Sequence, residues 1–204
     1  MIILVSGATR TVRRLRADHA STLGELIVPA SGNWPSPGRT WACDNGAFSG
    51  FDEAKFVRMM ERLRGIVGCR FVTAPDVVAD SAATLVLFDA WESRIRERGY
   101  PVALVAQDGL VPGDVPWERI DALFIGGSTE WKLSVHARAL VENAKRRGKW
   151  VHVGRVNTRK RMTRMMSWGV DSIDGTQWSR WADTHLARGL RHVERCLAQG
   201  KLAI

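Results

Sequence analysis

The sequence predicts an α/β protein: a compact (β/α)8 barrel that forms a single domain over residues 1–204. Short apolar runs alternate with amphipathic helical stretches, which is the pattern of a parallel sheet. Eight such runs occur, the number that closes a barrel of this kind. Several end in polar or glycine-containing clusters, as expected at the carboxyl ends of barrel strands.

The expected elements follow from these patterns in chain order. The strands are 2–7, 24–31, 40–47, 70–78, 102–109, 122–128, 150–156 and 171–176. Helices are expected from apolar residues at helical spacing over 51–65, 81–99, 128–148, 157–169 and 184–200, and those over 81–99 and 128–148 also have Ser or Thr starts and Gly ends.

Two connections are too short to hold a full helix. The segment "SGNWPSPGRT" (31–40) is rich in Pro and Gly, and "VPWERI" offers only one helical turn between the fifth and sixth strands. Missing helices would let 204 residues form a fold that typically needs about 250. A doubly wound open sheet is the alternative, but no GxGxxG follows the first strand.

The composition excludes several classes of protein. No run of 18 apolar residues occurs, so no membrane span is expected, and the N-terminus does not read as a signal peptide. Cys43, Cys69 and Cys196 are odd in number and form no CxxC, which favours a reducing, cytoplasmic location over a disulfide or zinc framework. His152 is expected to be a hydrogen-bonded interior residue rather than a metal ligand. We expect neither a metal nor a cofactor, because no HExxH or P-loop is present.

The net charge of +9 and the pI of about 10.3 favour a polyanionic partner such as nucleic acid, or else reflect an arginine-rich genome. Positive charge is concentrated in "TVRRLRADHA" and in "GRVNTRKRMTR" at 154–164. The second segment supplies candidate phosphate ligands: Arg155, Arg159, Lys160 and Arg161. A solvated helix face is the alternative for each segment.

Polar side chains follow the expected strands at the end where barrel enzymes place catalytic groups. Asp44, Asp76, Gln107 and Asp174 each lie toward the end of a different expected strand. Acids that face one barrel mouth perturb each other's pKa values, as acid–base pairs require. Asp171, at the start of the last expected strand, is expected to be structural.

Each of these residues also has a structural alternative. Asp44 precedes Asn-Gly and could form an Asx turn. Asp76 could cap the next helix, although Asp80 is better placed to do so. Gln107 belongs to "QDG", which could simply form a turn.

These strand ends, in this order, resemble the tRNA-guanine transglycosylase superfamily, and most closely its branch that inserts 7-deazaguanine bases into DNA in phages and bacterial islands. The resemblance covers residues 41–180 and is carried by five segments: "CDNGAFSG" (43–50), "APDVVAD" (74–80), "LVAQDG" (104–109), "LFIGGSTEWK" (123–132) and "GVDSIDGTQWSR" (169–180). Three features differ. The family's Pro-Thr-Arg is Thr-Gln-Trp here, its zinc cluster and zinc subdomain have no counterpart, and the chain is much shorter. The missing subdomain and the basic charge favour DNA over RNA as the partner.

The resemblance implies that guanine in DNA is exchanged for a 7-deazaguanine such as preQ0 or preQ1. Asp174 would be the nucleophile that forms a covalent glycosyl ester, and Asp44 would be the general acid and base. Asp76 and Gln107 would read the edge of the base.

The same resemblance gives two glycines after the sixth strand, Gly126 and Gly127, as backbone groups that approach the base closely. The target base must leave the helix stack to reach a barrel mouth. Trp178 and Trp181 could stack on a base, with packing in the protein as the alternative. Three other functions stay open: an N-glycosylase, a deoxyribosyltransferase on the same barrel, and a non-catalytic nucleic-acid-binding barrel.

Overall fold

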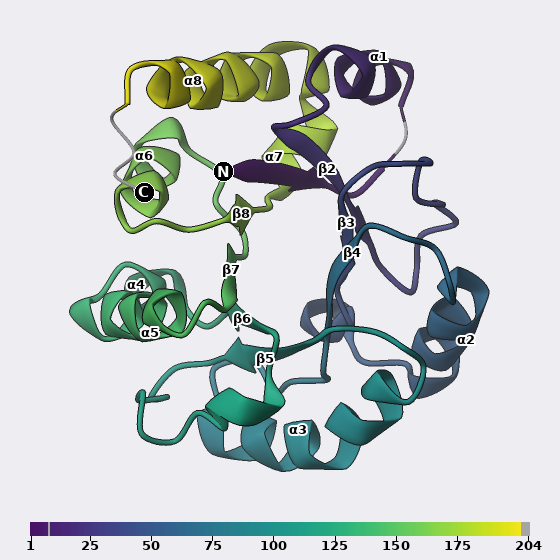
Figure 1. The fold of residues 1–204 in the computed structure, drawn as a ribbon, viewed down its shortest axis with the longest axis vertical. Coiled ribbons are helices and arrows are strands. Elements are labelled where there is room, and N and C mark those ends of the chain that lie inside the picture. Colours follow the sequence, from purple (N-terminus) through teal and green to yellow (C-terminus); the bar gives the residue numbers. More distant parts are fainter. Residues whose placement is uncertain (8, 201–204) are drawn as a thin grey trace.

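The computed structural model describes residues 1–7 and 9–200 and confirms a closed barrel of eight parallel strands (Figure 1). The strands are β1 (Ile2–Val5), β2 (Leu23–Ile27), β3 (Trp41–Cys43), β4 (Cys69–Thr73), β5 (Val102–Ala106), β6 (Ala122–Ile125), β7 (Trp150–Val153) and β8 (Ser172–Ile173). They pair in chain order, and β8 closes the barrel against β1. This closure rules out the open-sheet alternative.

Helices form a ring around the barrel (Figure 1). They are α1 (Arg10–Asp18), α2 (Glu53–Leu63), α3 (Ser81–Arg96), α4 (Thr129–Lys132), α5 (Val135–Arg146), α6 (Arg159–Ser167), α7 (Thr176–Arg180) and α8 (Ala187–Ala198), with short helices η1 (Ala47–Ser49), η2 (Trp117–Arg119) and the π-helical η3 (Ala182–Leu186). Among the described helices, none combines the length and apolar character needed to cross a bilayer.

The two expected helix-free connections are confirmed. Residues 28–40 join β2 to β3 without a helix, and only η2 lies between β5 and β6. The first connection is anchored by the buried Glu25 of β2, which accepts hydrogen bonds from the backbone N–H (2.6 Å) and hydroxyl (2.8 Å) of Ser36. Arg16 of α1 forms an ion pair with the same carboxylate at 2.7 Å. A buried charge pair with further hydrogen bonds therefore fixes the loop that replaces a helix.

The single helix expected over 128–148 is wrong in one respect, because the chain forms two helices there. The hydroxyl of Ser128 caps α4 by accepting from the N–H of Trp131, and that of Ser134 caps α5 by accepting from the N–H of Ala137. A second capping serine stops the first helix after one turn and starts a new one.

The core has two layers. One lies between the strands and the helix ring, and the other fills the barrel with side chains of Leu4, Leu26, Ala42, Phe71, Ala103, Val105, Ala122 and Phe124. The rings of Phe71 and Phe124 meet edge to face at a centroid distance of 6.2 Å, and His152 lies 4.5 Å from Phe124. These rings make the barrel interior a packed core, so a cavity can open only above it.

Candidate functional site

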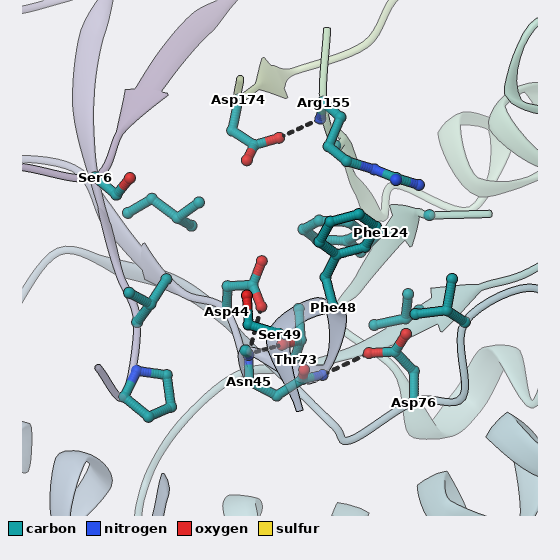
Figure 2. Close-up of a pocket in the computed structure, with 18 of the residues that line it drawn as sticks. Ser6, Asp44, Asn45, Phe48, Ser49, Thr73, Asp76, Phe124, Arg155 and Asp174 are labelled. Carbon is teal, nitrogen blue, oxygen red and sulfur yellow. Dashed lines mark hydrogen bonds between the residues drawn. The ribbon is translucent and has the colours of Figure 1, made fainter. Parts of the chain in front are cut away.

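A cavity of about 490 Å³ opens at the carboxyl ends of the strands. Residues that follow six consecutive strands line it, as the sequence analysis expected: Asp44, Asp76, Gln107, Gly126, Gly127, Arg155 and Asp174. Figure 2 shows Asp174 and Asp44 directed toward the same space; Asp76, also labelled there, follows β4. The volume lies within the range typical of small-molecule sites.

Asp174 follows the short strand β8 and is held through one carboxylate oxygen. Its Oδ1 accepts a hydrogen bond of 2.6 Å from the backbone N–H of Arg155, whose φ of +59° is unusual for a residue other than glycine. Oδ2 has no hydrogen-bond partner in the part of the chain that the structure describes. The side chain is 18% exposed. One oxygen is therefore fixed, and the other is available to a ligand.

The side chain of Arg155 bridges the cavity. Its guanidinium donates a hydrogen bond to the carbonyl of Gly127 and lies 4.5 Å from the ring centroid of Phe48. Phe48, in η1, lines the cavity with 69% of its surface exposed. Sequence reasoning assigned Phe48 no role, although its place after Asp-Asn-Gly at a strand end was the available signal.

His152 of β7 lies below Asp174 and is fully buried. Its Nδ1 is 2.9 Å from the hydroxyl oxygen of Ser172, which also accepts from the indole N–H of Trp150. Its Nε2 has no hydrogen-bond partner among the described residues and faces Oδ1 of Asp174 at 3.6 Å. The expectation of a fully hydrogen-bonded interior histidine is wrong for this nitrogen, because Asp174 stands just beyond hydrogen-bonding distance.

Asp44 forms the turn that was its structural alternative, and it also lines the cavity. Its Oδ1 accepts a hydrogen bond of 2.7 Å from the N–H of Gly46, which makes an Asx turn, and its carboxyl lines the cavity. Burial raises the pKa of Asp44 to about 7, and the charges of Asp174 and Asp76 add to this effect. The Gly46 N–H and the Arg155 charge oppose it. A carboxyl with this pKa can both give and take a proton near neutral pH.

Two neutral amides hold the carboxylate of Asp76. Asn45 donates to one of its oxygens at 2.8 Å and Gln107 to the other at 2.5 Å. Burial raises the pKa of Asp76, and these two hydrogen bonds lower it. Sequence reasoning missed Asn45, which is buried, because it read as a turn residue. The expected helix cap is Asp80, which accepts from the N–H of Ala83.

Gln107 and the two glycines line the cavity mainly by building its wall. The side-chain Oε1 of Gln107 accepts from the backbone N–H groups of Ala79 (2.9 Å) and Gly127 (2.8 Å), and the side-chain NH₂ donates to Asp76. A Cβ at Gly126 would lie 2.9 Å from that amide nitrogen. The backbone N–H and C=O of Gly127 are both engaged within the protein. The structure therefore assigns Gln107 and Gly127 supporting contacts, where free base-reading groups were expected.

Lys132 is a buried cation behind the site that the sequence did not indicate. Its ammonium donates a hydrogen bond of 2.9 Å to the carbonyl of Gly154, the residue before Arg155. Burial lowers the pKa of Lys132 to about 8, assisted by the charge of Arg155, while the carboxylate of Asp174 raises it. Lys132 therefore fixes the backbone that positions the N–H donor to Asp174.

The residues expected to bind nucleic acid do not all face the cavity. Arg155 lines it, whereas Arg159, Lys160 and Arg161 lie on α6 outside it, where Arg161 shares a small second pocket with Arg155. Trp178 is only 3% exposed and belongs to the core, so the expectation that it stacks on a base is wrong. The turn of α7 directs its ring inward, against Gly175 and Gly189.

Trp181, unlike the buried Trp178, has 57% of its surface exposed.

Asp171 is structural, as expected. Its carboxylate accepts from Lys145 at 2.7 Å and from the N–H of Val151 at 2.7 Å. Within residues 1–7 and 9–200, no three His, Cys, Asp or Glu side chains gather as a metal-binding group.

No family model and no curated protein matches the chain. Among solved structures, an HpcH/HpaI aldolase from Desulfitobacterium hafniense DCB-2 is 12% identical over 94% of this chain and 91% of its own, with a TM-score of 0.47. The phosphodiesterase PaMucR in its c-di-GMP complex is 12% identical over 82% of this chain and 65% of its own, with a TM-score of 0.39. Neither likeness bears on the activity of this protein.

Proposed function

We propose that this protein is a base transglycosylase that exchanges guanine in DNA for a 7-deazaguanine such as preQ0 or preQ1, through a covalent glycosyl ester on Asp174. One observation carries the proposal. Two carboxylates, Asp174 after β8 and Asp44 after β3, face one cavity and differ in their surroundings. Two carboxylates of this kind can perform a displacement in two steps at an anomeric carbon.

In the first step, Oδ2 of Asp174 attacks C1′ of a deoxyguanosine while the bond from C1′ to N9 breaks. The electron pair of that bond goes to guanine, and protonated Asp44 transfers its proton to the leaving base. The pKa of about 7 gives Asp44 a protonated population at neutral pH. The Arg155 N–H keeps the attacking carboxylate in place through its other oxygen.

In the second step, guanine leaves the cavity and the 7-deazaguanine enters. Ionised Asp44 takes the N9 proton of the incoming base, N9 attacks C1′, and the ester bond to Asp174 breaks. The two displacements retain the configuration at C1′. Asp44 therefore uses both of its protonation states in one cycle.

Recognition of the base is assigned to Asp76 and Phe48. Guanine and 7-deazaguanines share N–H donors at N1 and at the 2-amino group, which suit a carboxylate that is held as an acceptor by Asn45 and Gln107. The exposed ring of Phe48 offers a stacking face on the cavity wall. The target base would be flipped out of the DNA to reach this space. The proposal also places the protein in the cytoplasm, which is the host's cytoplasm if a phage encodes it.

A second candidate, a deoxyribosyltransferase for free nucleosides, is favoured by the charge of the cavity lining. Lys55 and Arg155 are the only cations among the described residues that line it. With so few positive charges, the lining suits a base and a sugar better than phosphates. Free deoxyguanosine and a guanine-containing duplex distinguish the two candidates, since a DNA enzyme exchanges only the second.

The test is nucleoside mass spectrometry of DNA and RNA from cells that make the protein and are supplied with preQ0 or preQ1. The proposal expects a 7-deazaguanine deoxynucleoside in DNA with the wild-type protein and none with Asp174→Ala. The matched control is Asp108→Ala. This acid follows β5 but lies outside the cavity, where it accepts a hydrogen bond from the N–H of Ser128. Modified DNA in the Asp174→Ala cells would remove the proposal.

A further inference from the structure

Basic and acidic residues are nearly equal in number in the middle of the chain, whereas basic residues are in excess in its C-terminal part. Residues 51–150 contain 15 Lys and Arg against 14 Asp and Glu, whereas residues 151–204 contain 10 against 4. The first segment forms surface ion pairs such as Arg64–Glu61, Arg119–Asp89 and Arg138–Glu142. The excess of positive charge therefore lies over the C-terminal helices.

Helix α8 carries three of these cations in one row. Arg188, Arg191 and Arg195 are spaced by three and four residues, which places them on the same helix face, and all three are exposed. None of them forms an ion pair with a described residue. The acid within this row, Glu194, is instead bound to His19 at 2.6 Å and to the hydroxyl of Thr22 at 3.0 Å.

Helices α6 and α1 lie on either side of α8 and extend the row (Figure 1). A contact of 2.9 Å between Thr163 and His192 joins α6 to α8, and the bond between His19 and Glu194 joins α1 to α8. Exposed cations continue on both neighbours, again with no ion pair among the described residues: Arg10, Arg13 and Arg14 on α1, and Arg159, Lys160 and Arg164 on α6.

The cations of neighbouring helices act on each other across this face. Burial lowers the pKa of His192 on α8, and the charges of Arg159 on α6 and Arg195 on its own helix lower it further. The acid Asp183 in η3 is engaged by the hydroxyl of Thr11 at 2.8 Å. The face formed by α1, α6 and α8 therefore holds like charges close together, and two of its acids, Asp183 and Glu194, are engaged by neighbouring side chains of the protein.

We infer that the face formed by α1, α6 and α8 binds the phosphodiester backbone of the nucleic acid that flanks the cavity. Helix α8 is about 18 Å long, and a duplex carries one charge for about every 1.7 Å of its axis, so the face can meet several phosphates. The first turns of α1 and α6 follow β1 and β7 at the cavity end of the barrel. Nucleic acid on this face can therefore reach the cavity with a flipped base.

The helices that form this face are not suited to a membrane surface. An interfacial helix exposes its apolar side to the lipid. Here the apolar sides are buried in the core: Met162, Met165 and Met166 on α6, and Leu190 and Val193 on α8. Apart from Lys160, the exposed cations named on these helices are guanidinium groups, which pair with phosphate through two hydrogen bonds.

This inference deepens the proposed function by assigning where the substrate's flanks bind, and its test measures binding alone. Failure of the inference would therefore leave the chemistry at Asp174 untouched. The variant is Arg188→Gln/Arg191→Gln/Arg195→Gln in the full chain. The control, Arg64→Gln/Arg119→Gln/Arg138→Gln, removes the same charge from exposed, ion-paired arginines elsewhere. Circular dichroism and thermal melting establish that both variants are folded.

Fluorescence anisotropy with a labelled 20-base-pair duplex is recorded over a salt series, with single-stranded DNA, RNA and phosphatidylserine vesicles as further probes. The α8 variant is expected to lower the slope of log affinity against log salt by about 2–3 and to weaken duplex binding roughly tenfold or more, while the control stays near wild type. An equal loss of duplex affinity in both variants would show that binding depends only on net charge, and this would overturn the inference. Loss of vesicle binding without loss of nucleic-acid binding would overturn it as well.

Discussion

The two carboxylates of the cavity come from different walls of the barrel, at strand ends separated by β1 and β2, and are held in different ways. Asp44 follows β3 and is fixed within its own turn by the N–H of Gly46, in surroundings that raise its pKa to about 7. Asp174 follows β8 and is fixed from the next strand end by the N–H of Arg155. His152 and Lys132 support the Asp174 wall from below and behind.

The comparison shows how one residue type can take two roles. A carboxyl with a pKa near the working pH exchanges protons well, whereas a carboxylate held rigidly through one oxygen can present the other as a nucleophile. The walls differ in their backbone: Asp44 relies on a glycine with φ of +80°, and Asp174 on an arginine in the same left-handed region. The second arrangement is strained, which fits a site that must hold one geometry.

The largest expected effect comes from removing the nucleophile. Asp174→Asn should lower the rate of base exchange by at least about 10⁴-fold, because no covalent intermediate can form. Exchange is measured as incorporation of a labelled 7-deazaguanine into duplex DNA. Asp171→Asn in the same segment loses its ion pair with Lys145 and should lower the melting temperature while exchange continues. Exchange by Asp174→Asn at the wild-type rate would break the comparison.

Substitution of Asp44, the group proposed to transfer protons, should lower the rate less than substitution of Asp174. Asp44→Asn removes the general acid and base, and kcat should fall by roughly 10²–10⁴-fold. In the wild type, kcat should change with an apparent pKa near 7, and this change should be absent from the residual activity of the variant. An unaltered pH profile in Asp44→Asn would assign the titration to another group.

The Asp44→Asn substitution, which lowers kcat, should raise the stability of the folded protein. Because the pKa of Asp44 lies above that of an unfolded aspartate, ionising it costs the folded state stability as the pH rises from about 4 through 7. Asp44→Asn should therefore raise the free energy of unfolding at pH 8 by up to about 4 kcal/mol, and leave it unchanged near pH 3.5. Denaturant unfolding at both pH values checks this. A variant less stable than wild type at pH 8 contradicts it.

Base recognition should give an effect on binding rather than on rate. Asp76→Asn exchanges a charged acceptor for a neutral amide, and KM for the incoming base should rise roughly 10–100-fold with kcat little changed. Asp108→Asn is the matched control, because this acid lies outside the cavity. A fall in kcat with KM unchanged would contradict this prediction and indicate that Asp76 takes part in the chemical step.

The smallest effect is expected at His152, which acts as a positioning residue through Asp174. Ser172 accepts from Trp150 and can donate to Nδ1 of His152, which leaves the hydrogen of a neutral imidazole on Nε2, facing Asp174. His152→Phe should pack against Phe71 and Phe124, and should lower kcat about tenfold at unchanged KM. A fall in melting temperature alone would assign His152 to packing.

Sequence reasoning reached the barrel and most of the cavity lining because both depend on local patterns. Strand-length apolar runs fix the topology, and the ends of parallel strands meet at one edge, so Asp44, Asp76 and Asp174 could be brought together before the structure was known. What failed depends on side-chain direction. The inward turn of Trp178, the engaged amide of Gln107 and the buried Lys132 arise from packing between distant segments, which no single stretch encodes.

The most direct test of the central claim is to trap the covalent intermediate. The protein is mixed with a guanine-containing oligonucleotide without an incoming base, quenched in acid, and examined by intact-protein and peptide mass spectrometry. The account predicts a deoxyribosyl ester on the peptide that contains Asp174, absent in Asp174→Asn. An ester on Asp44 instead, or continued exchange with no ester on any residue, would contradict it.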